Sequence, residues 1–161
     1  MQLEHDDAYY MGLALVEARK AMALGEVPIG AVLVRRGEVV AAAHNWRELA
    51  PDPTGHAEML VIREAARRLG GWRLTESTLY VTIEPCPMCA GAIVQARIER
   101  LVYGAADPKA GAVDSLMDLV RHPGLNHQVE VTAGVRAEEC QELMKEFFRK
   151  LRLNKQKDAR V

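Results

Sequence analysis

The sequence predicts an α/β fold, a three-layer α/β/α sandwich around a central five-stranded mixed sheet. Two observations support this fold class. In the second half of the chain, apolar strand segments alternate with helical segments, which is typical of βαβ units with parallel strands. In the first half, an amphipathic helix is followed by a hairpin, which adds antiparallel strands. The chain has 161 residues, and we expect residues 1–161 to form a single domain.

The first helix is predicted over residues 6–24, and Gly25 ends it. Its apolar stripe consists of residues spaced four, three and four apart, namely Met11, Leu15, Ala18 and Met22. The segments IGAVLV (29–34) and VVAAA (39–43) have the composition of strands. A charged turn around Arg36-Gly37 joins them, so we expect a β-hairpin here.

The middle of the chain predicts a loop, a helix, a strand and a second helix. The loop is NWRELAPDPTG (45–55), which contains two prolines. The helix is expected over 57–69, closed by Gly70-Gly71. The apolar segment TLYVTI (78–83) predicts a buried strand, and Pro87 stands where a helix can start. That helix is expected to end at about residue 96.

The last third of the chain predicts two more strands and a long helix. RLVYG (100–104) and residues 129–133 are the strands. Residues 105–126 between them predict mixed loop with a short helix near 115–120. The last helix is expected from residue 137 to about 154, and its apolar face consists of Cys140, Leu143, Met144, Phe147 and Leu151.

The cysteines and the N-terminus indicate the compartment. The three cysteines, two of them close together, argue against an oxidised disulfide framework. Cys140 fits the apolar face of its helix, and we expect it to be a packed core thiol. The N-terminus has no basic region followed by an apolar stretch, so it does not resemble a secretory signal. No apolar run approaches the roughly 18 residues of a membrane span. We therefore expect a cytoplasmic protein with no membrane partner.

The charge is unevenly distributed. The net charge of −1 and the pI of about 6.5 argue weakly against a nucleic-acid partner. Residues 149–161, however, contain six basic residues against one acid, which leaves +5 on this segment. The basic residues are Arg149, Lys150, Arg152, Lys155, Lys157 and Arg160. A basic tail on a nearly neutral body suggests an interaction with a polyanion, and a solvated helix end is the simpler alternative.

The pair Cys86-x-x-Cys89 has three possible interpretations: a thioredoxin-like redox pair, half of a structural zinc site, or half of a catalytic zinc site. The pair follows a strand and lies in the first turn of a helix. Free backbone N–H groups and the helix dipole favour thiolates there. A redox pair would also lie at a helix start, so location alone does not decide.

His56 and Glu58 favour a catalytic zinc site. Such a site has three protein ligands and leaves a position for water, whereas a structural site has four. Together with Cys86 and Cys89, His56 supplies three, and the chain has no second CxxC. Other histidines have no convincing spacing for a fourth ligand: His5, His44, His122 and His127. Residues two apart in an ideal helix point about 200° apart, so His56 must lie at the very start of its helix. Glu58 is then a carboxylate that moves protons without binding the metal.

Together these residues form H-x-E…P-C-x-x-C, the signature of zinc-dependent nucleobase deaminases. In that chemistry a zinc-bound water of lowered pKa attacks the carbon that bears an exocyclic amine, and the glutamate transfers the protons. Deaminases of free cytidine, of deoxycytidylate, of guanine and of bases in polynucleotides share this motif. The motif alone does not separate them.

The chain also resembles one family, the bacterial tRNA-specific adenosine deaminases, which convert adenosine at the wobble position (34) of a tRNA anticodon to inosine. The resemblance covers about residues 10–152. The matching segments are VPIGAVLV (27–34), DPTGHAEM (52–59), TLYVTIEPCPMCAGAI (78–93) and YGAADPKAGAVDSLMDLVRHPGLNH (103–127). The last segment is the most specific, because smaller nucleoside deaminases need no such loop. Within it the chain departs from the family pattern at Pro108, Ala110 and Asp114.

The resemblance implies a cytidine deaminase-like fold, one Zn²⁺ per subunit, and a homodimer that contacts tRNA from both subunits. It implies zinc binding by His56, Cys86 and Cys89 and catalysis by Glu58. The residues implied to contact the purine are Asn45, at its edge, and Val27, Pro28 and Ile29, as an apolar wall. Those implied to contact nucleotides of the anticodon loop are Asp107, Lys109, His122, Asn126, Phe148 and Arg149.

Several of these residues have simpler alternatives. Asn45 could cap a turn, Asp107 and Lys109 could belong to a solvated loop, and Phe148 could belong to the core. For the whole chain, the alternatives are a deaminase of a free base, nucleoside or nucleotide such as guanine or cytidine, and a non-catalytic zinc module. The basic tail argues against the first, and Glu58 argues against the second.

Overall fold

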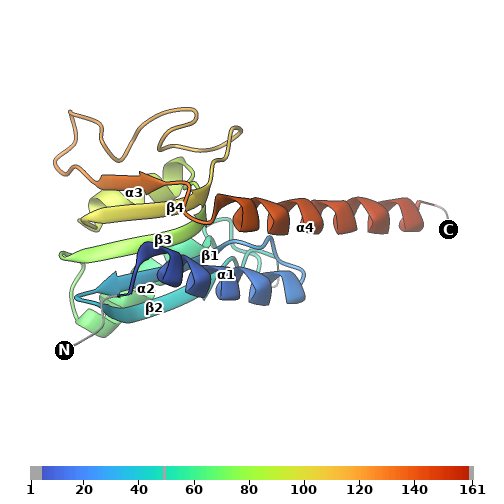
Figure 1. Cartoon of the computed structure of the whole chain (residues 1–161), viewed down its shortest axis with the longest axis horizontal. Coiled ribbons are helices and arrows are strands. Elements are labelled where there is room, and N and C mark those ends of the chain that lie inside the picture. Colours follow the sequence, from blue (N-terminus) through green and yellow to red (C-terminus); the bar gives the residue numbers. More distant parts are fainter. Residues whose placement is uncertain (1–4, 49, 160–161) are drawn as a thin grey trace.

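The computed structural model describes residues 5–48 and 50–159, which are arranged around a five-stranded sheet with the order β2-β1-β3-β4-β5 (Figure 1). The strands are β1 (Gly30–Arg35), β2 (Glu38–His44), β3 (Ser77–Ile83), β4 (Arg100–Ala105) and β5 (Glu130–Ala133). β1 pairs antiparallel with β2 and with β3, whereas β3, β4 and β5 are parallel. The sheet is therefore mixed, and the predicted hairpin and parallel half are both confirmed.

Helices cover both faces of this sheet. They are α1 (Asp7–Ala23), α2 (Ala57–Leu69), α3 (Pro87–Gln95) and α4 (Ala137–Asp158). α1 and α4 pack with one apolar cluster, and α2 and α3 pack with the other on the opposite face. The predicted three-layer α/β/α sandwich is confirmed.

The strands supply both apolar clusters by alternation. On β1, Leu33 belongs to the cluster beneath α2 and α3, while Val32 and Val34 belong to the cluster beneath α1 and α4. On β4, Leu101 and Val102 divide in the same way. Successive side chains of a strand point to opposite faces. A strand covered on both faces is therefore apolar along its length, which explains the uninterrupted apolar runs in the sequence.

The predicted short helix near residues 115–120 is wrong. This segment belongs to the β4–β5 loop (residues 106–129), which contains turns but no helix or strand. The N–H group of Leu119, which an α-helix here would direct to the carbonyl of Ser115, is used by another acceptor. Ala112 O accepts from the N–H of Leu119 at 3.0 Å, and Val113 O accepts from the guanidinium of Arg121 at 2.9 Å. These contacts replace the helical ladder of hydrogen bonds.

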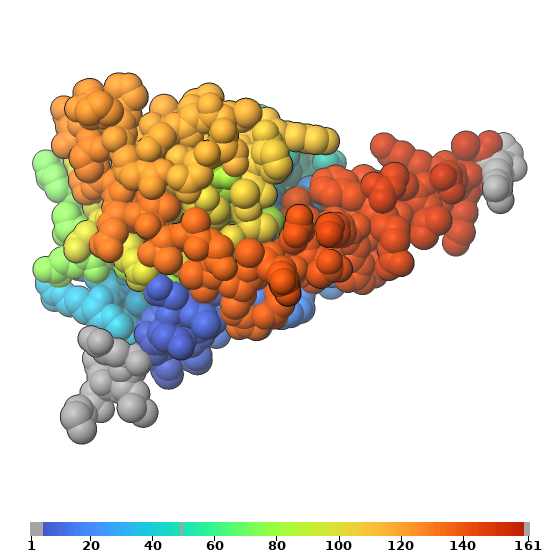
Figure 2. Space-filling model, turned by 45° about the horizontal axis from the view of Figure 1, so that its top comes forward, coloured from blue at the N-terminus to red at the C-terminus, as the bar shows by residue number. Residues whose placement is uncertain are grey.

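Helix α4 is longer than predicted, ending at Asp158, and projects away from the rest of the molecule (Figures 1 and 2). Its first turns are anchored by Cys140 and Leu143, which are buried. The prediction that Cys140 is a core thiol is confirmed. From Phe148 onward the described residues of the helix are exposed, so residues 149–158 of the basic tail form a solvated helical arm. Arg160 of the predicted tail lies outside the described residues. Among the described residues, no helix is long and apolar enough to cross a membrane.

Candidate active site

Three side chains that could hold a metal ion meet at the edge of the sheet where β3 ends. His56 is the N-cap residue of α2, Cys86 is the N-cap residue of α3, and Cys89 lies in the first turn of α3. His56 Nδ1 lies 3.6 Å from Cys86 Sγ and 3.4 Å from Cys89 Sγ. In the described part of the chain, these three residues form the one group of His, Cys, Asp and Glu able to hold a metal ion. We call them the metal-ligand group.

Local sequence places each ligand at a helix start. His56 has an extended backbone (φ −83, ψ 146), which confirms that it precedes the helix and does not lie within it. Gly55 is required just before it, because a Cβ there would lie 2.3 Å from Trp46 O. Pro87 occupies the first turn of α3, where its fixed φ suits the helix and its missing N–H costs nothing.

The distances fit a zinc ion. Zinc bonds of about 2.3 Å to sulfur and 2.0–2.1 Å to nitrogen, at a tetrahedral angle, separate the two donor atoms by about 3.6 Å. The two sulfur–nitrogen distances of 3.6 and 3.4 Å agree with this value. Three protein ligands from two helix starts leave the fourth tetrahedral position open, as catalytic zinc sites require.

The charge state of Cys86 also suits a metal. Hydrogen bonds with Cys89 and His56 lower the pKa of the Cys86 thiol to about 4. The same contact with Cys86 raises the pKa of His56. For Cys89, the hydrogen bond to Cys86 and burial of the thiol both raise the pKa. Cys86 is therefore a thiolate at neutral pH, which is the form of cysteine that binds zinc.

Glu58 lies beside the metal-ligand group without belonging to it. Its side chain is buried, and it contacts the thiol of Cys89. Burial disfavours the carboxylate and raises the pKa of Glu58 to about 7. An acid whose pKa is close to the ambient pH can both accept and donate a proton, as general acid–base catalysis needs.

Asn45 lies next to this group and is buried. Its Oδ1 accepts from the N–H of Ala57, the first residue of α2, at 2.8 Å. Asn45 therefore does have a capping role, its simpler alternative. What it caps is the start of α2, where His56 is the N-cap residue. Asn45 N–H donates to Ile29 O at 3.1 Å, so the Val27–Ile29 segment lies alongside. Pro28 in that segment is buried, whereas its two neighbours are half-buried.

A hollow lies at the same edge of the sheet, between the β4–β5 loop and α4. Its volume is about 300 Å³, and its lining residues are Ile83, Ala105, Ala106, Asp107, Lys109, Gln141, Met144 and Phe148. The structure thus brings together three residues predicted to contact RNA: Asp107, Lys109 and Phe148. Phe148 is 40% exposed, so the alternative that it belongs to the core is wrong.

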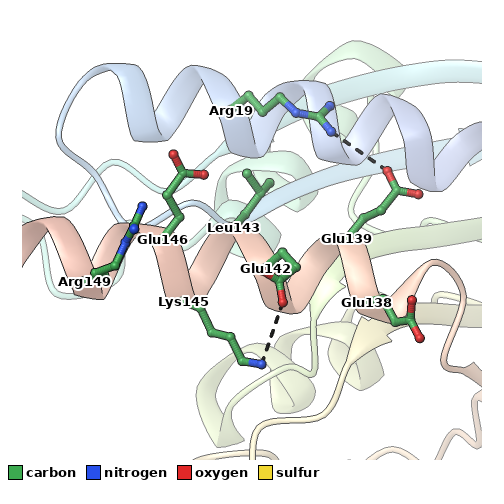
Figure 3. Close-up of a pocket in the computed structure, with 8 residues that line it drawn as sticks. All are labelled: Arg19, Glu138, Glu139, Glu142, Leu143, Lys145, Glu146 and Arg149. Atoms are coloured by element: carbon green, nitrogen blue, oxygen red, sulfur yellow. Dashed lines mark ion pairs between the residues drawn. The ribbon is translucent and has the colours of Figure 1, made fainter.

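Arg149 follows Phe148 but lies on another side of α4. It lines a charged groove of about 670 Å³ between α1 and α4, together with Glu146, Glu142 and Arg19 (Figure 3). Dashed lines in Figure 3 mark the ion pairs Arg19–Glu139, 3.9 Å, and Lys145–Glu142, 3.7 Å. Arg149 has no ion-pair partner among the described residues.

His122 and Asn126 lie away from the metal-ligand group. Both are exposed in the part of the β4–β5 loop that approaches the start of β5. The neighbouring His127 Nε2 lies 2.6 Å from Ile98 O, just before β4 begins. This is the opposite edge of the sheet from Cys86. One chain alone therefore does not bring His122 and Asn126 to the site.

Sequence reasoning did not single out two buried carboxylates, Glu26 and Glu84. Glu26 accepts hydrogen bonds from the N–H groups of Arg47, at 3.1 Å, and Glu48, at 2.8 Å, so it anchors the loop after Asn45. Burial alone would raise the pKa of Glu84, but hydrogen bonds led by the Ser115 hydroxyl lower it overall. For Glu84, the signal available in the sequence was an acid directly after a buried strand, where a carboxylate needs partners.

The fold and the His/Cys/Cys group beside a buried glutamate define a deaminase of the cytidine deaminase-like class. The family model for MafB19-like deaminases matches residues 4–152. A solved structure from a study of A-to-I editing by tRNA:A34 deaminases is 50% identical with a TM-score of 0.81, covering 84% of this chain and 98% of that one. The guanine deaminase from Bacillus subtilis is 37% identical with a TM-score of 0.62, covering 63% of this chain and 66% of that one.

A relative found by sequence shows to which family within this class of deaminases the chain belongs. The chain is 56% identical over 154 residues to the tRNA-specific adenosine deaminase of Bacillus subtilis, covering 96% of this chain and 95% of the relative. The chain therefore belongs to the family of tRNA-specific adenosine deaminases.

Proposed function

We propose that this protein is a tRNA adenosine deaminase that hydrolyses adenosine to inosine at the wobble position (34) of an anticodon. The observation that carries the proposal is the metal-ligand group beside the buried, non-ligand Glu58. It occurs in a chain that is 56% identical to a tRNA-specific adenosine deaminase over nearly its whole length. We propose one zinc ion per subunit, held by His56, Cys86 and Cys89.

The chain supplies the proton transfers. Zinc, when bound, activates a water for attack on the carbon that bears the amine. Glu58 would accept one proton from that water and give it to the ring nitrogen, and would then move the proton of the new hydroxyl on the attacked carbon to the departing amine, which leaves as ammonia. Its burial and its pKa of about 7 suit both transfers, because neither protonation state is strongly favoured at neutral pH.

Asn45 and Val27–Ile29 hold the purine. The Oδ1 of Asn45 accepts from Ala57 N–H, which fixes the orientation of the side chain. Its amide N–H groups have no partner among the described residues and can donate to a purine ring nitrogen. Val27 and Ile29 are half-buried beside it, where they offer an apolar wall.

The anticodon loop binds along the hollow between the β4–β5 loop and α4. Asp107 and Lys109 contact its nucleotides, and Phe148 offers an aromatic face on which a base can stack. Arg149 and the basic arm beyond it contact phosphates. Arg149 is free to do so, because no ion pair engages it within the described residues.

We also propose that the whole chain acts as one domain and that the protein forms a homodimer in the cytoplasm. An apolar groove of about 570 Å³ runs along α2 and α3, and its lining includes Ile62, Ala66 and Trp72. Trp72 is 54% exposed, and such apolar patches commonly mark interfaces. His122 and Asn126, distant from the metal-ligand group of their own chain, would contact RNA bound at the partner's site.

The test uses purified zinc-loaded protein and an anticodon stem–loop RNA with adenosine at the wobble position. Free adenosine, guanine and cytidine are assayed in parallel, with nucleoside mass spectrometry and ammonia release as readouts. We expect inosine in the RNA and no ammonia from the free compounds. Ammonia from guanine alone would instead favour the deaminase of a free base.

A further inference from the structure

Glu84 is a buried carboxylate at the end of β3, two residues before Cys86 and outside the metal-ligand group. It accepts hydrogen bonds from five donors of the β4–β5 loop. They are the N–H groups of Asp107, 3.0 Å, Val113, 3.1 Å, Asp114, 2.9 Å, and Ser115, 3.0 Å, and the hydroxyl of Ser115. Both carboxylate oxygens are used.

The loop is wrapped closely around this carboxylate. A Cβ on Gly111 would lie 2.3–2.4 Å from the carboxylate atoms of Glu84, so glycine is needed for the approach. The backbone on either side of Glu84 contributes as well. Glu84 N–H donates to Ala105 O at 2.9 Å, and Pro85 O accepts from Ala112 N–H at 2.8 Å. Residues 107–115 are thus fastened to the segment that leads into Cys86.

These residues have no helix or strand of their own to fix their conformation. They carry Asp107 and Lys109, which line the hollow opposite Phe148. Asp107 is tied directly, because its N–H donates to Glu84 while its own Oδ1 accepts from Lys109 N–H at 3.1 Å. The shape of the wall that faces RNA therefore depends on one buried charge.

We propose that Glu84 is a positioning residue that holds residues 107–115 in the conformation that binds the anticodon loop. The assignment of an RNA ligand to this wall rests on the function proposed above. Glu84 acts through the loop and contacts neither the metal nor the base. It couples the segment that supplies Cys86 to the wall that selects the RNA.

The test compares Glu84→Gln with wild type and with Glu76→Gln. Glutamine keeps the shape but replaces one acceptor oxygen by an NH₂ group, which cannot accept the loop N–H groups. Glu76 is an exposed control, paired with Arg36 at the other end of β3. Hydrogen exchange of residues 107–115, zinc content, and KM and kcat on the stem–loop RNA are measured for all three proteins.

In Glu84→Gln we expect exchange in 107–115 to be about tenfold faster or more, with strand amides unchanged, because local opening becomes easier. We expect full zinc content and a KM raised about tenfold or more, with a much smaller change in kcat. Glu76→Gln should match wild type in every readout. Unchanged exchange, or loss of zinc, would overturn the assignment of Glu84 to the loop.

Two further variants keep the test decisive. Ser115→Ala removes one of the five donors and should shift exchange and KM in the same direction by less. A double-mutant cycle combines Glu84→Gln with Lys109→Ala. The loss of kcat/KM in the double variant should be smaller than the product of the losses in the two single variants, because both residues act through one loop. Multiplicative losses would count against the proposal. If the wild type edits no RNA, the proposed function fails, and hydrogen exchange alone still decides whether Glu84 holds the loop.

Discussion

The metal-ligand group and the β4–β5 loop lie at the same edge of the sheet but are built differently. The ligands come from two helix starts, where a few neighbouring residues determine the backbone. The loop has no regular elements and depends on contacts with distant residues. Glu84 holds one part of it, and Asp114 holds another through Tyr103 and Arg121.

If the proposed function holds, this difference means that two separately built regions carry the chemistry and the choice of substrate. The metal-ligand group requires only that two helices begin correctly. The loop can change its residues while the sheet and the ligands remain, which is how one scaffold can serve deaminases of different substrates. The first three substitutions below alter one of these two regions and should leave the other intact.

The largest effect is expected from Cys86→Ala. Removing one of three ligands should abolish bound zinc and all deamination, because the remaining two cannot hold the ion in its geometry. Metal analysis and inosine formation are measured together. Cys140→Ala, which alters a core thiol away from the group, is the matched control and should keep its zinc. Deamination by a zinc-free Cys86→Ala protein would show that the metal-ligand group is not the catalytic site.

Glu58→Gln should lower kcat by a factor of about 10² to 10⁴, the usual size of a general acid–base contribution. Zinc content should remain at the wild-type level, because Glu58 is not a ligand. Single-turnover assays on the stem–loop RNA measure the loss. A variant that loses its zinc would show instead that Glu58 supports the metal.

Gly111→Ala should displace the β4–β5 loop without changing zinc binding. The added methyl would lie against the Glu84 carboxylate, so the loop must move. We expect a destabilisation of about 1–3 kcal/mol, as for other overpacking substitutions. Urea denaturation measures this loss in the free energy of unfolding. Zinc content should not change. Gly71→Ala is the control, because its Cβ would meet nothing within 4 Å. Equal stability of the two variants would contradict the tight wrapping of the loop.

Removing the residues after Arg149 should weaken tRNA binding and reduce its dependence on salt. Each lost phosphate contact should lower the slope of log K against log salt by about 0.7 to 0.9. Binding is measured across a salt series, with melting temperature as the control for folding. An unchanged slope would mean that the basic arm is only a solvated helix end.

The smallest effect is expected at the far edge of the sheet, in Asp7→Asn. Arg100 donates to both oxygens of Asp7, at 2.8 and 2.6 Å, and lowers its pKa. A carboxylate with a lowered pKa stabilises the fold above its unfolded pKa of about 3.9, and this contribution is lost as the pH falls below that value. The variant should be less stable than wild type by about 1 kcal/mol at pH 7. Urea denaturation should show the gap narrowing as the pH falls below about 3.9, and a constant gap would contradict the ion pair.

Most helices and strands, and the grouping of His56, Cys86 and Cys89, could be predicted from the sequence for a physical reason. Alternation, helix periodicity and helix-start residues are local, and His56, Cys86 and Cys89 each depend on such local signals. The wrong helix near 115–120 had favourable local composition, but the N–H of Leu119 donates to Ala112 O and not to Ser115 O, four residues before it. The roles of Glu26 and Glu84 depend on partners more than twenty residues away, which no spacing rule reveals.

One measurement tests the central claim most directly. Two anticodon stem–loops are offered to the zinc-loaded enzyme, one with adenosine at the wobble position and one with the adenosine moved one nucleotide along the loop. Inosine is quantified in each by mass spectrometry of the digested RNA. If the metal-ligand group does the chemistry and the loop selects the RNA, inosine forms only at the wobble position. Equal inosine in both RNAs, or none in either, would contradict the account.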